Sequence, residues 1–284
     1  MKEASEAWGN FRVILGYNTN GFAHHRLSDA LAILRELGYA GVALTPDVNH
    51  FDPDRDDVAA LTAELLDFRV VVETGARFLL DPRRKHQPTL LSDSPDDRQY
   101  RSDFLRGCVT LAAELQADAV SFWSGAPTTG EPYAVLLDRL AGECQSLAEY
   151  AAERGVRLAF EPEPGMLIDT MPRFADLHAA VNHPSFGLTL DLGHLVCQGE
   201  TPVSEHVAAW GEWLWNVHVE DMRPGVHDHL MFGEGTVDFA DAFDALHAVG
   251  YQGVVSVELS RHSHNAVEAA RRSREFLARY VADV

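Results

Sequence analysis

Short apolar runs alternate with longer amphipathic segments along most of the chain, and this alternation predicts the fold. Eight runs have the length and composition of buried strands, at residues 12–18, 41–45, 70–74, 118–123, 157–161, 187–191, 215–219 and 253–258. Six other segments carry apolar residues at helical spacing, at residues 27–38, 100–116, 133–155, 172–182, 238–250 and 264–280. Gly38, Gly155 and Gly250 end three of them, as is common for helices.

This strict alternation of strand and helix is typical of a parallel sheet. Eight repeats in 284 residues predict a closed (β/α)8 TIM barrel, because such barrels form single domains of about 250 residues. We expect one barrel domain over residues 1–284, with residues 1–10 as a flexible N-terminal tail. A doubly wound open sheet is the main alternative. It would ordinarily show a glycine-rich phosphate loop after an early strand, and the sequence contains none.

The chain is strongly acidic, which disfavours some classes of partner. It holds 43 acidic and 23 basic residues, for a net charge of −20. Such a surface repels phosphate backbones, and no basic run with interleaved aromatic residues is present, so we expect no nucleic-acid partner. No run approaches the ~18 uninterrupted apolar residues of a membrane span, and the N-terminus lacks the layout of a secretion signal. We therefore expect no membrane partner.

The cysteines and lysines narrow the chemistry further. Cys108, Cys144 and Cys197 are odd in number and widely spaced, which favours a reduced, cytoplasmic protein. The only lysines are Lys2, in the expected tail, and Lys85, in the polar stretch DPRRKHQP. Because an imine-forming enzyme needs a desolvated lysine, Schiff-base catalysis is disfavoured.

Polar residues end the last four predicted strands, at the level where barrels of this kind build their active sites. The fifth strand ends at Glu161, the sixth at Asp191, the seventh near His218 and the eighth at Glu258. Residues two apart share a face of a strand, so the residues behind these four would point into the barrel: Ala159, Thr189, Asn216 and Ser256. The alternate faces would contact the helices through Leu158, Phe160, Leu188, Leu190, Trp215, Val217, Val255 and Val257.

Any one of these four polar residues, taken alone, is more often a simple strand end than a ligand. Four in succession on the same parity favour a metal site. Three converging carboxylates would repel one another and raise their pKa values unless a cation lay among them. Three carboxylates and one imidazole suit one divalent ion, Mn²⁺ first and then Mg²⁺ or Co²⁺, and they do not exclude Zn²⁺. Such an ion could hold two adjacent substrate oxygens and polarise a carbonyl.

Five ordered motifs accompany the last four strands: FEPEPG (160–165), LDLGH (190–194), VHVED (217–221), HDHLMFGEGTVDF (227–239) and SVELS (256–260). Together they resemble the xylose-isomerase-like barrels, and more closely the sugar-phosphate isomerase/epimerase family. The resemblance implies that Glu161, Asp191, His218 and Glu258 bind one divalent metal ion. It also implies that Glu161 and Glu258 act as acid and base through a cis-enediolate. His194 and Arg223 resemble residues that contact the substrate.

The implied reaction is isomerisation or epimerisation of a sugar, sugar phosphate or keto-polyol, by removal and return of a proton next to a carbonyl. Expulsion of the adjacent hydroxyl needs the same residues, so a dehydratase of inosose or dehydroshikimate type is the closest alternative. A barrel that binds a sugar or metal without turnover belongs to a different class, and the complete ligand set speaks against it.

The related apurinic-site endonucleases (family 2) hold three zinc ions and need extra histidines after the second to fourth strands. Here the third strand ends ETGARF and the fourth SFWSGAP, and neither offers one. The net charge of −20 also argues against a nuclease. His194, His227 and His229 could still form a second metal position. We favour His229 as a substrate contact and His227 as a solvated partner.

The long segment of residues 75–99 would lie over the active-site face. Its basic cluster could bind a substrate phosphate or carboxylate, or could be simply solvated: Arg77, Arg83, Arg84, Lys85 and His86. Asn18 and Asn20 could reach substrate hydroxyls or form a turn, and Glu163 is expected to support the E-P-E-P turn. We expect a carbohydrate or polyol as the small-molecule partner, and the apolar content is compatible with a homo-oligomer.

Overall fold

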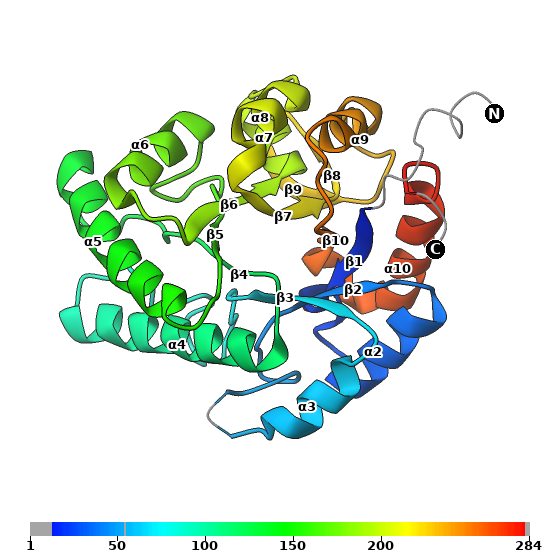
Figure 1. Ribbon diagram of the computed structural model, residues 1–284, viewed down its shortest axis with the longest axis horizontal. Coiled ribbons are helices and arrows are strands. Elements are labelled where there is room, and N and C mark those ends of the chain that lie inside the picture. The colour runs from blue at the N-terminus through cyan, green and yellow to red at the C-terminus, as the bar shows by residue number, and fades with distance from the viewer. Residues whose placement is uncertain (1–12, 54, 282–284) are drawn as a thin grey trace.

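Eight parallel strands close into a barrel in this computed structural model, which describes residues 13–53 and 55–281 (Figure 1). The barrel strands are β1 (Ile14–Asn18), β2 (Gly41–Leu44), β3 (Arg69–Glu73), β4 (Val120–Phe122), β5 (Leu158–Phe160), β6 (Phe186–Asp191), β7 (Leu214–Val219) and β10 (Val254–Val257). Each pairs in parallel with the next barrel strand, and β10 pairs with β1 to close the ring. The predicted TIM barrel is confirmed. The tail predicted at residues 1–10 lies outside the described residues.

Helices form an outer ring around the barrel (Figure 1). They are α2 (Leu27–Glu36), α3 (Val58–Leu65), α4 (Pro95–Leu115), α5 (Tyr133–Ala152), α6 (Met171–Val181), α7 (Leu192–Gln198), α8 (Val203–Trp210), α9 (Phe239–Ala248) and α10 (Ala266–Leu277). The six predicted helices are present as α2, α4, α5, α6, α9 and α10. The pattern did not predict α3, α7 and α8, because each has at most 8 residues and too few turns to show a helical period.

Shorter elements occupy the loops. In the part of the chain that the structure describes, the 3₁₀ helices are η1 (Thr19–Phe22), η2 (Gly211–Trp213) and η3 (Ser260–Asn265). An antiparallel hairpin of β8 (Asp221–Arg223) and β9 (Val226–Leu230) follows β7 and carries the H-D-H segment. This hairpin was not predicted, because its mostly polar residues give no strand signal.

Two apolar clusters of described residues hold the barrel together. The larger lies between strands and helices and contains all the residues predicted to face the helices except Trp215. The smaller fills the barrel interior with Val71, Ala119, Ala159 and Val254. Trp215 packs against this inner cluster, so its predicted contact with the helices is wrong. The register between β6 and β7 shifts between Leu188 and Thr189, and the extra residue in β7 turns Trp215 inward.

A buried polar layer lies above this inner cluster. Thr189 on β6 donates its hydroxyl to Ser121 Oγ on β4 at 2.9 Å. Because β5 separates these two strands in the sheet, the bond crosses the barrel interior. Asn216 Nδ2 lies 3.4 Å from the same threonine oxygen, and all three side chains are buried. The predicted inward direction of Thr189 and Asn216 is confirmed.

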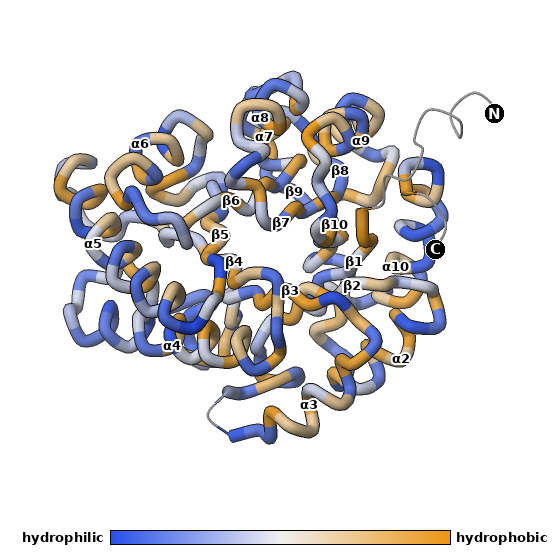
Figure 2. The backbone as a smooth tube through the Cα atoms, in the orientation of Figure 1, coloured by the Kyte–Doolittle hydropathy of each residue, from blue (hydrophilic) through white to orange (hydrophobic). Residues whose placement is uncertain are grey.

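Most of the outer helices bury one face against the barrel and expose the other. Figure 2 shows hydrophilic and hydrophobic residues alternating along outer helices such as α4 and α5, as expected when one face packs on a core. The three cysteines are free and buried. Within residues 13–53 and 55–281, no helix combines the length and the apolar character needed to span a membrane.

Candidate active site

Four side chains converge where β5, β6, β7 and β10 end. Asp191 is the last residue of β6 and His218 lies in β7, while Glu161 and Glu258 directly follow β5 and β10. One potential ligand atom from each of the four lies within 4.8 Å of the others. His218 Nδ1 lies 2.9 Å from Glu161 Oε1 and also 2.9 Å from Glu258 Oε2. The structure thus brings the four predicted metal ligands together, and we call them the carboxylate cluster.

Asp191 shows why this cluster suits a cation. Its Oδ1 accepts the backbone N–H of His194 at 2.8 Å and so caps the start of α7. Its Oδ2 is buried and has no hydrogen-bond partner among the described residues. Because a buried carboxylate oxygen without a partner is costly, the arrangement favours a bound cation.

Burial and mutual repulsion shift the pKa values of the cluster. Burial, together with Glu258 and Asp191, raises the pKa of Glu161 to about 8, although His218 opposes the shift. Burial by itself lowers the pKa of His218, but the carboxylates around it raise that pKa well above its ordinary value. Burial likewise opposes ionisation of Glu258, yet His218 outweighs it and holds the pKa of Glu258 below the ordinary range. The members of the cluster thus compete with one another for protons, and a bound divalent cation can take the place of these protons.

The donor set fits one divalent metal ion. Three carboxylates and one imidazole provide oxygen-rich ligation without sulfur, which suits Mn²⁺, Mg²⁺ or Co²⁺ and admits Zn²⁺. Glu161, Asp191, His218 and Glu258 are the residues that would hold the ion. Asp191 Oδ2, which lies 3.6 Å from His194 Nε2 but has no hydrogen-bond partner among the described residues, supports this fit independently of the motifs.

Glu73, the last residue of β3, is part of the site although the sequence pattern did not single it out. Its Oε1 lies 2.9 Å from His218 Nε2 and accepts Asn216 Nδ2 at 3.0 Å. Because His218 Nε2 faces Glu73, Nδ1 is left to face the carboxylate cluster. Carboxylates commonly orient metal-binding imidazoles in this way. A signal was available, since Glu73 lies one residue before the end of the predicted strand 70–74, on the same parity as the inward-facing Val71.

Asn20 holds Glu258 from the β1 side of the barrel. Asn20 Nδ2 donates to Glu258 Oε1 at 2.7 Å. Asn18 instead forms the turn, because its Oδ1 accepts the backbone N–H of Asn20 at 3.0 Å and the hydroxyl of Thr45 at 2.8 Å. Asn18 therefore forms the turn, and Asn20 orients a cluster carboxylate, a role that was not predicted. Both residues line the cavity, so their contact with substrate hydroxyls stays a prediction.

Glu220, from the VHVED motif, packs beside Asp191. Its side chain is wholly buried, and burial followed by Asp191 raises its pKa well above the ordinary value. Gly193 makes room for it, because a Cβ at residue 193 would lie 2.0 Å from Glu220 Oε1. This close approach gives a physical reason for the glycine in LDLGH.

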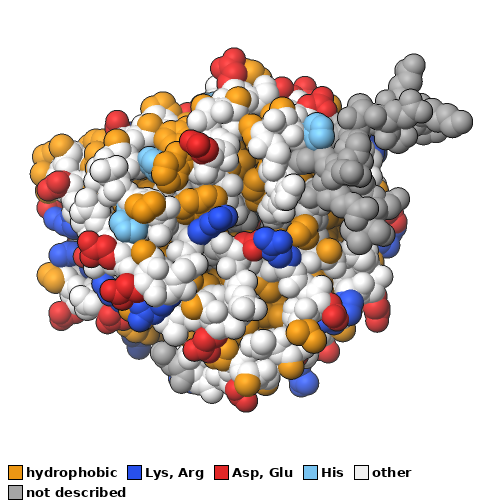
Figure 3. Space-filling model, viewed as in Figure 1, with side chains coloured by type: hydrophobic (Ala, Val, Ile, Leu, Met, Phe, Trp, Pro, Cys, Tyr) orange, Lys and Arg blue, Asp and Glu red, His pale blue; other side chains and the backbone are white. Residues whose placement is uncertain are grey.

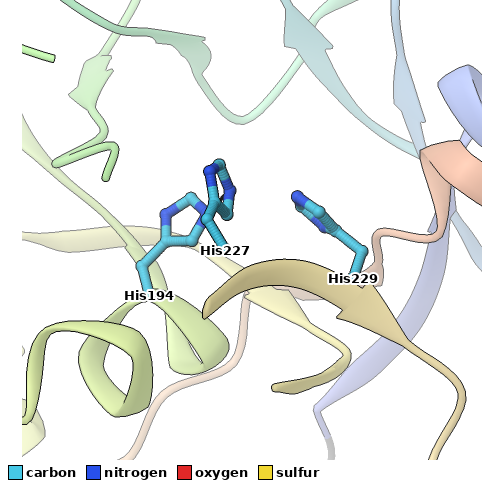
Figure 4. Close-up of side chains that lie close together, drawn as sticks. All are labelled: His194, His227 and His229. Carbon is cyan, nitrogen blue, oxygen red and sulfur yellow. Dashed lines mark hydrogen bonds between the residues drawn. The ribbon is translucent and has the colours of Figure 1, made fainter. Parts of the chain in front are cut away.

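Three histidines form a second group beside the carboxylate cluster (Figure 4). His194 comes from α7, and His227 and His229 come from β9. One ring nitrogen of each lies within 4.8 Å of the others, and His194 Nε2 lies 3.1 Å from His227 Nε2. Figure 4 shows the rings of His194 and His227 close together, with the ring of His229 to one side.

Backbone carbonyls orient two of these rings. His194 Nδ1 lies 3.2 Å from Pro162 O. His229 Nδ1 lies 3.1 Å from Glu258 O. With Nδ1–H donating to a carbonyl, each ring presents an Nε2 lone pair. Burial lowers the pKa of His194, and burial with the two neighbouring histidines lowers that of His227 to about 4. Neutral rings of this kind can accept a substrate hydroxyl or bind a transition metal ion.

A cavity of about 340 Å³ opens at the carboxylate cluster, within the range of small-molecule sites. Its acidic lining consists of Glu73, Glu161, Glu163 and Glu258. His86 and Trp123 form part of its wall, with ring centroids 5.6 Å apart. In Figure 3, acidic side chains are spread around the edge of the face shown, and Lys or Arg side chains also appear near its centre.

The three predicted substrate contacts differ in their relation to this cavity. His229 lines it, and His194 lies buried against the carboxylate cluster, with its Nδ1 3.8 Å from Glu161 Oε1. Arg223 lies in β8 with an exposed side chain, and its Nε donates to the carbonyl of Glu234 at 3.3 Å. The structure therefore does not bring Arg223 to the cavity, and its contact with substrate stays a prediction.

A family model described as xylose isomerase-like TIM barrel matches residues 31–280. This chain belongs to that family. The matched range contains the strand ends that form the carboxylate cluster and the hairpin that carries His227 and His229.

Similar proteins include named sugar epimerases. The L-ribulose-5-phosphate 3-epimerase UlaE of Shigella flexneri serotype 5b is 25% identical over 234 residues, which cover 81% of each chain. An uncharacterized protein of Methanocaldococcus jannaschii is also 25% identical, over 186 residues that span 63% of each chain.

Solved structures share the fold at lower identity. The D-allulose 3-epimerase of Methylomonas sp. in complex with D-allulose superposes with a TM-score of 0.75 at 20% identity, covering 94% of this chain and 96% of that one. The IOLI protein with a binding zinc atom superposes with a TM-score of 0.76 at 17% identity, covering 94% and 98%. At these identities the likeness shows the fold alone.

Proposed function

We propose that this protein is a divalent-metal-dependent isomerase or epimerase. Its substrate would be a sugar, sugar phosphate or keto-polyol, and the reaction would move a proton next to the carbonyl through a cis-enediolate. The main support is the pair Glu161 and Glu258, which both line the cavity and both lie 2.9 Å from His218 Nδ1. The epimerase activities named for the relatives, on L-ribulose 5-phosphate and D-allulose, are consistent with it.

In this reaction the two cavity glutamates act as base and acid. Glu258, held by Asn20, removes the proton from the substrate carbon, and Glu161 returns one to the opposite face. A divalent ion held by the carboxylate cluster would supply Lewis-acid polarisation of the carbonyl. Glu73 keeps the imidazole of His218 oriented throughout.

The reaction can be tested without knowing the natural substrate. We would incubate the Mn²⁺-loaded protein with a panel of ketoses and inososes in D₂O and follow the products by NMR. Deuterium at the carbon next to the carbonyl, without loss of water, is the expected result. An enone or diketone product would instead identify a dehydratase, and no exchange across a broad panel would favour a binding protein.

Glu161→Gln and Glu258→Gln test the assignment of acid and base. General acid–base catalysis contributes about 10²–10⁴-fold to a rate, so each variant should exchange deuterium at least about 10²-fold more slowly than the wild type. Glu234→Gln is the matched control, because Glu234 is an exposed glutamate outside the cavity lining. Full exchange in either cavity variant, with the metal still bound, would refute the mechanism.

A further inference from the structure

Three cationic side chains line a cavity whose inner end is acidic. Arg77 and Lys85 come from the loop between β3 and α4, and Arg261 lies in η3 after β10. Lys85 and Arg261 are exposed, whereas the glutamates Glu73 and Glu161 of the same cavity are buried. Lys85 and Arg261 therefore lie toward the mouth, and Arg77 is half-buried. In a chain of net charge −20, a convergence of cations from two loops runs against the average surface charge.

Both arginines are held in place by carboxylates. Arg77 Nε lies 3.2 Å from Asp47 Oδ2. Arg261 Nη1 lies 2.6 Å from Asp228 Oδ1. Each guanidinium also donates to a backbone carbonyl. Because a guanidinium has five N–H donors, these contacts orient both groups and leave donors for a ligand.

Lys85 differs from the two arginines because no ion pair or hydrogen bond holds its ammonium within the described residues. It is the only lysine in the described part of the chain. Burial, and then Arg77 and Arg261, lower its pKa. Glu163 and Asp47 oppose this shift in pKa, but repulsion among the three cations outweighs these nearby carboxylates. An anion placed among the cations would relieve this repulsion.

We propose that Lys85, with Arg77 and Arg261, binds an anionic group of the substrate, either a phosphate ester or a carboxylate. This inference rests on the proposed function, because it assigns the reacting carbon to the carboxylate cluster and the anionic group to the cationic mouth. Lysine binds phosphate as a point charge, and arginine adds directed N–H donors. A neutral ketose would leave Lys85 unmatched. The substrate class is therefore an acidic sugar, not a neutral one.

The test compares matched ligands on the full-length protein. Dissociation constants for D-fructose, D-fructose 6-phosphate and 5-keto-D-gluconate would be measured by titration calorimetry on the Mn²⁺-loaded form. Inorganic phosphate would be titrated into the metal-free form, where no metal can ligate it. Lys85→Gln is the test variant. Arg83→Gln is the matched control, because Arg83 is exposed in the same loop and does not line the cavity.

We expect an anionic ketose to bind about tenfold or more tightly than D-fructose, as charge-assisted contacts allow. Lys85→Gln should remove most of this gain and leave D-fructose unaffected, and Arg83→Gln should change neither. The anionic ketose that shows the gain identifies the group as phosphate or carboxylate. If neither shows it, or if the gain survives in Lys85→Gln, the inference is overturned.

Failure of the proposed function has a different signature. In that case no ketose would exchange deuterium, yet inorganic phosphate would still bind the metal-free protein in a Lys85-dependent way. Conversely, neutral and anionic ketoses could both exchange deuterium and bind with equal affinity. That result would support the proposed function and contradict the anion site. Loss of Lys85-dependent binding for every anion, inorganic phosphate included, would also count against the inference.

Discussion

The inner and outer ends of the cavity are built from different kinds of chain. The inner end consists of strand ends, and its side chains are mostly buried and contact one another across the barrel, as His218 contacts Glu73 at 2.9 Å. The outer end consists of loops and carries the exposed cations Lys85 and Arg261. Arg261 pairs with Asp228 on the neighbouring hairpin, and Lys85 makes no ion pair with the described residues. Under the proposed function, reaction chemistry and substrate choice would be carried by separate parts, so variants at the two ends should fail in different ways.

Asp191→Asn should have the largest effect, because it removes a charge from the inner end. Asparagine keeps an oxygen that can cap α7, so the melting temperature of the metal-free variant should stay close to that of the wild type. Metal affinity should fall by more than the about 10–100-fold typical of losing an outer partner. Calorimetric titration with Mn²⁺ measures this. Wild-type affinity would remove Asp191 from the ligand set.

Glu73→Gln tests whether the inner end extends beyond the four ligands. We expect metal affinity to fall by about 10–100-fold, because Gln cannot match the carboxylate that orients His218. The same titration on Glu234→Gln should show no change, since that side chain is exposed. Equal affinities in the two variants would limit the functional inner end to the carboxylate cluster.

Gly193→Ala tests the packing around the inner end. The new methyl would meet Glu220 Oε1 at 2.0 Å, so we expect a loss of about 1–3 kcal/mol in the free energy of unfolding. Gly142→Ala in α5 is the matched control, because no atom lies within 4 Å of its added Cβ. The control should gain about 0.5–1 kcal/mol. Urea unfolding of both measures the contrast, and equal stabilities would show that Glu220 moves freely.

His86, in the loop wall, should make stability depend on pH. Burial, with Lys85 and Arg101, lowers the pKa of His86 from 6.5 to about 4. Below 6.5 the unfolded chain binds a proton that the folded chain refuses, so stability is lost as the pH falls from 6.5 to about 4. The melting temperature of His86→Asn should therefore fall less over this window than that of the wild type. Identical pH profiles would contradict the assignment.

Arg223→Gln should have the smallest effect. Because the guanidinium is exposed, donates to the carbonyl of Glu234 and does not line the cavity, we expect KM to change by about twofold or less. Steady-state kinetics on the ketose that exchanges deuterium provides the measurement. A tenfold rise in KM would instead support the substrate contact predicted from its motif position, and would mean that the Arg223 side chain turns toward the cavity.

Most of the fold could be predicted because strand and helix periods are local properties. Each barrel strand has its own apolar run, and long helices such as α5 show several periods. The inward turn of Trp215 could not be predicted, because it depends on a register shift between two strands rather than on alternation within one. The helices α7 and α8 were not predicted, because they are too short to show a helical period.

The candidate site was predictable where chemistry coincides with strand ends. Glu161, Asp191 and Glu258 stand out because each is a carboxylate directly at the end of a parallel strand. Glu73 obeys the same rule, but its importance depends on His218, which is 145 residues away in the chain. The direction of Arg223 depends on how the hairpin folds, which no local pattern encodes.

The contact between Glu73 and His218 also bears on how the molecule assembles. These residues lie on β3 and β7, and Asn20 reaches Glu258 over 238 residues in a similar way. Neither contact can form within one half of the chain. During refolding, full Mn²⁺ affinity would therefore require strands from both halves of the chain, although the four proposed ligands all come from the second half. A fragment that ends before β7 would contain Glu73 but would lack the imidazole of His218.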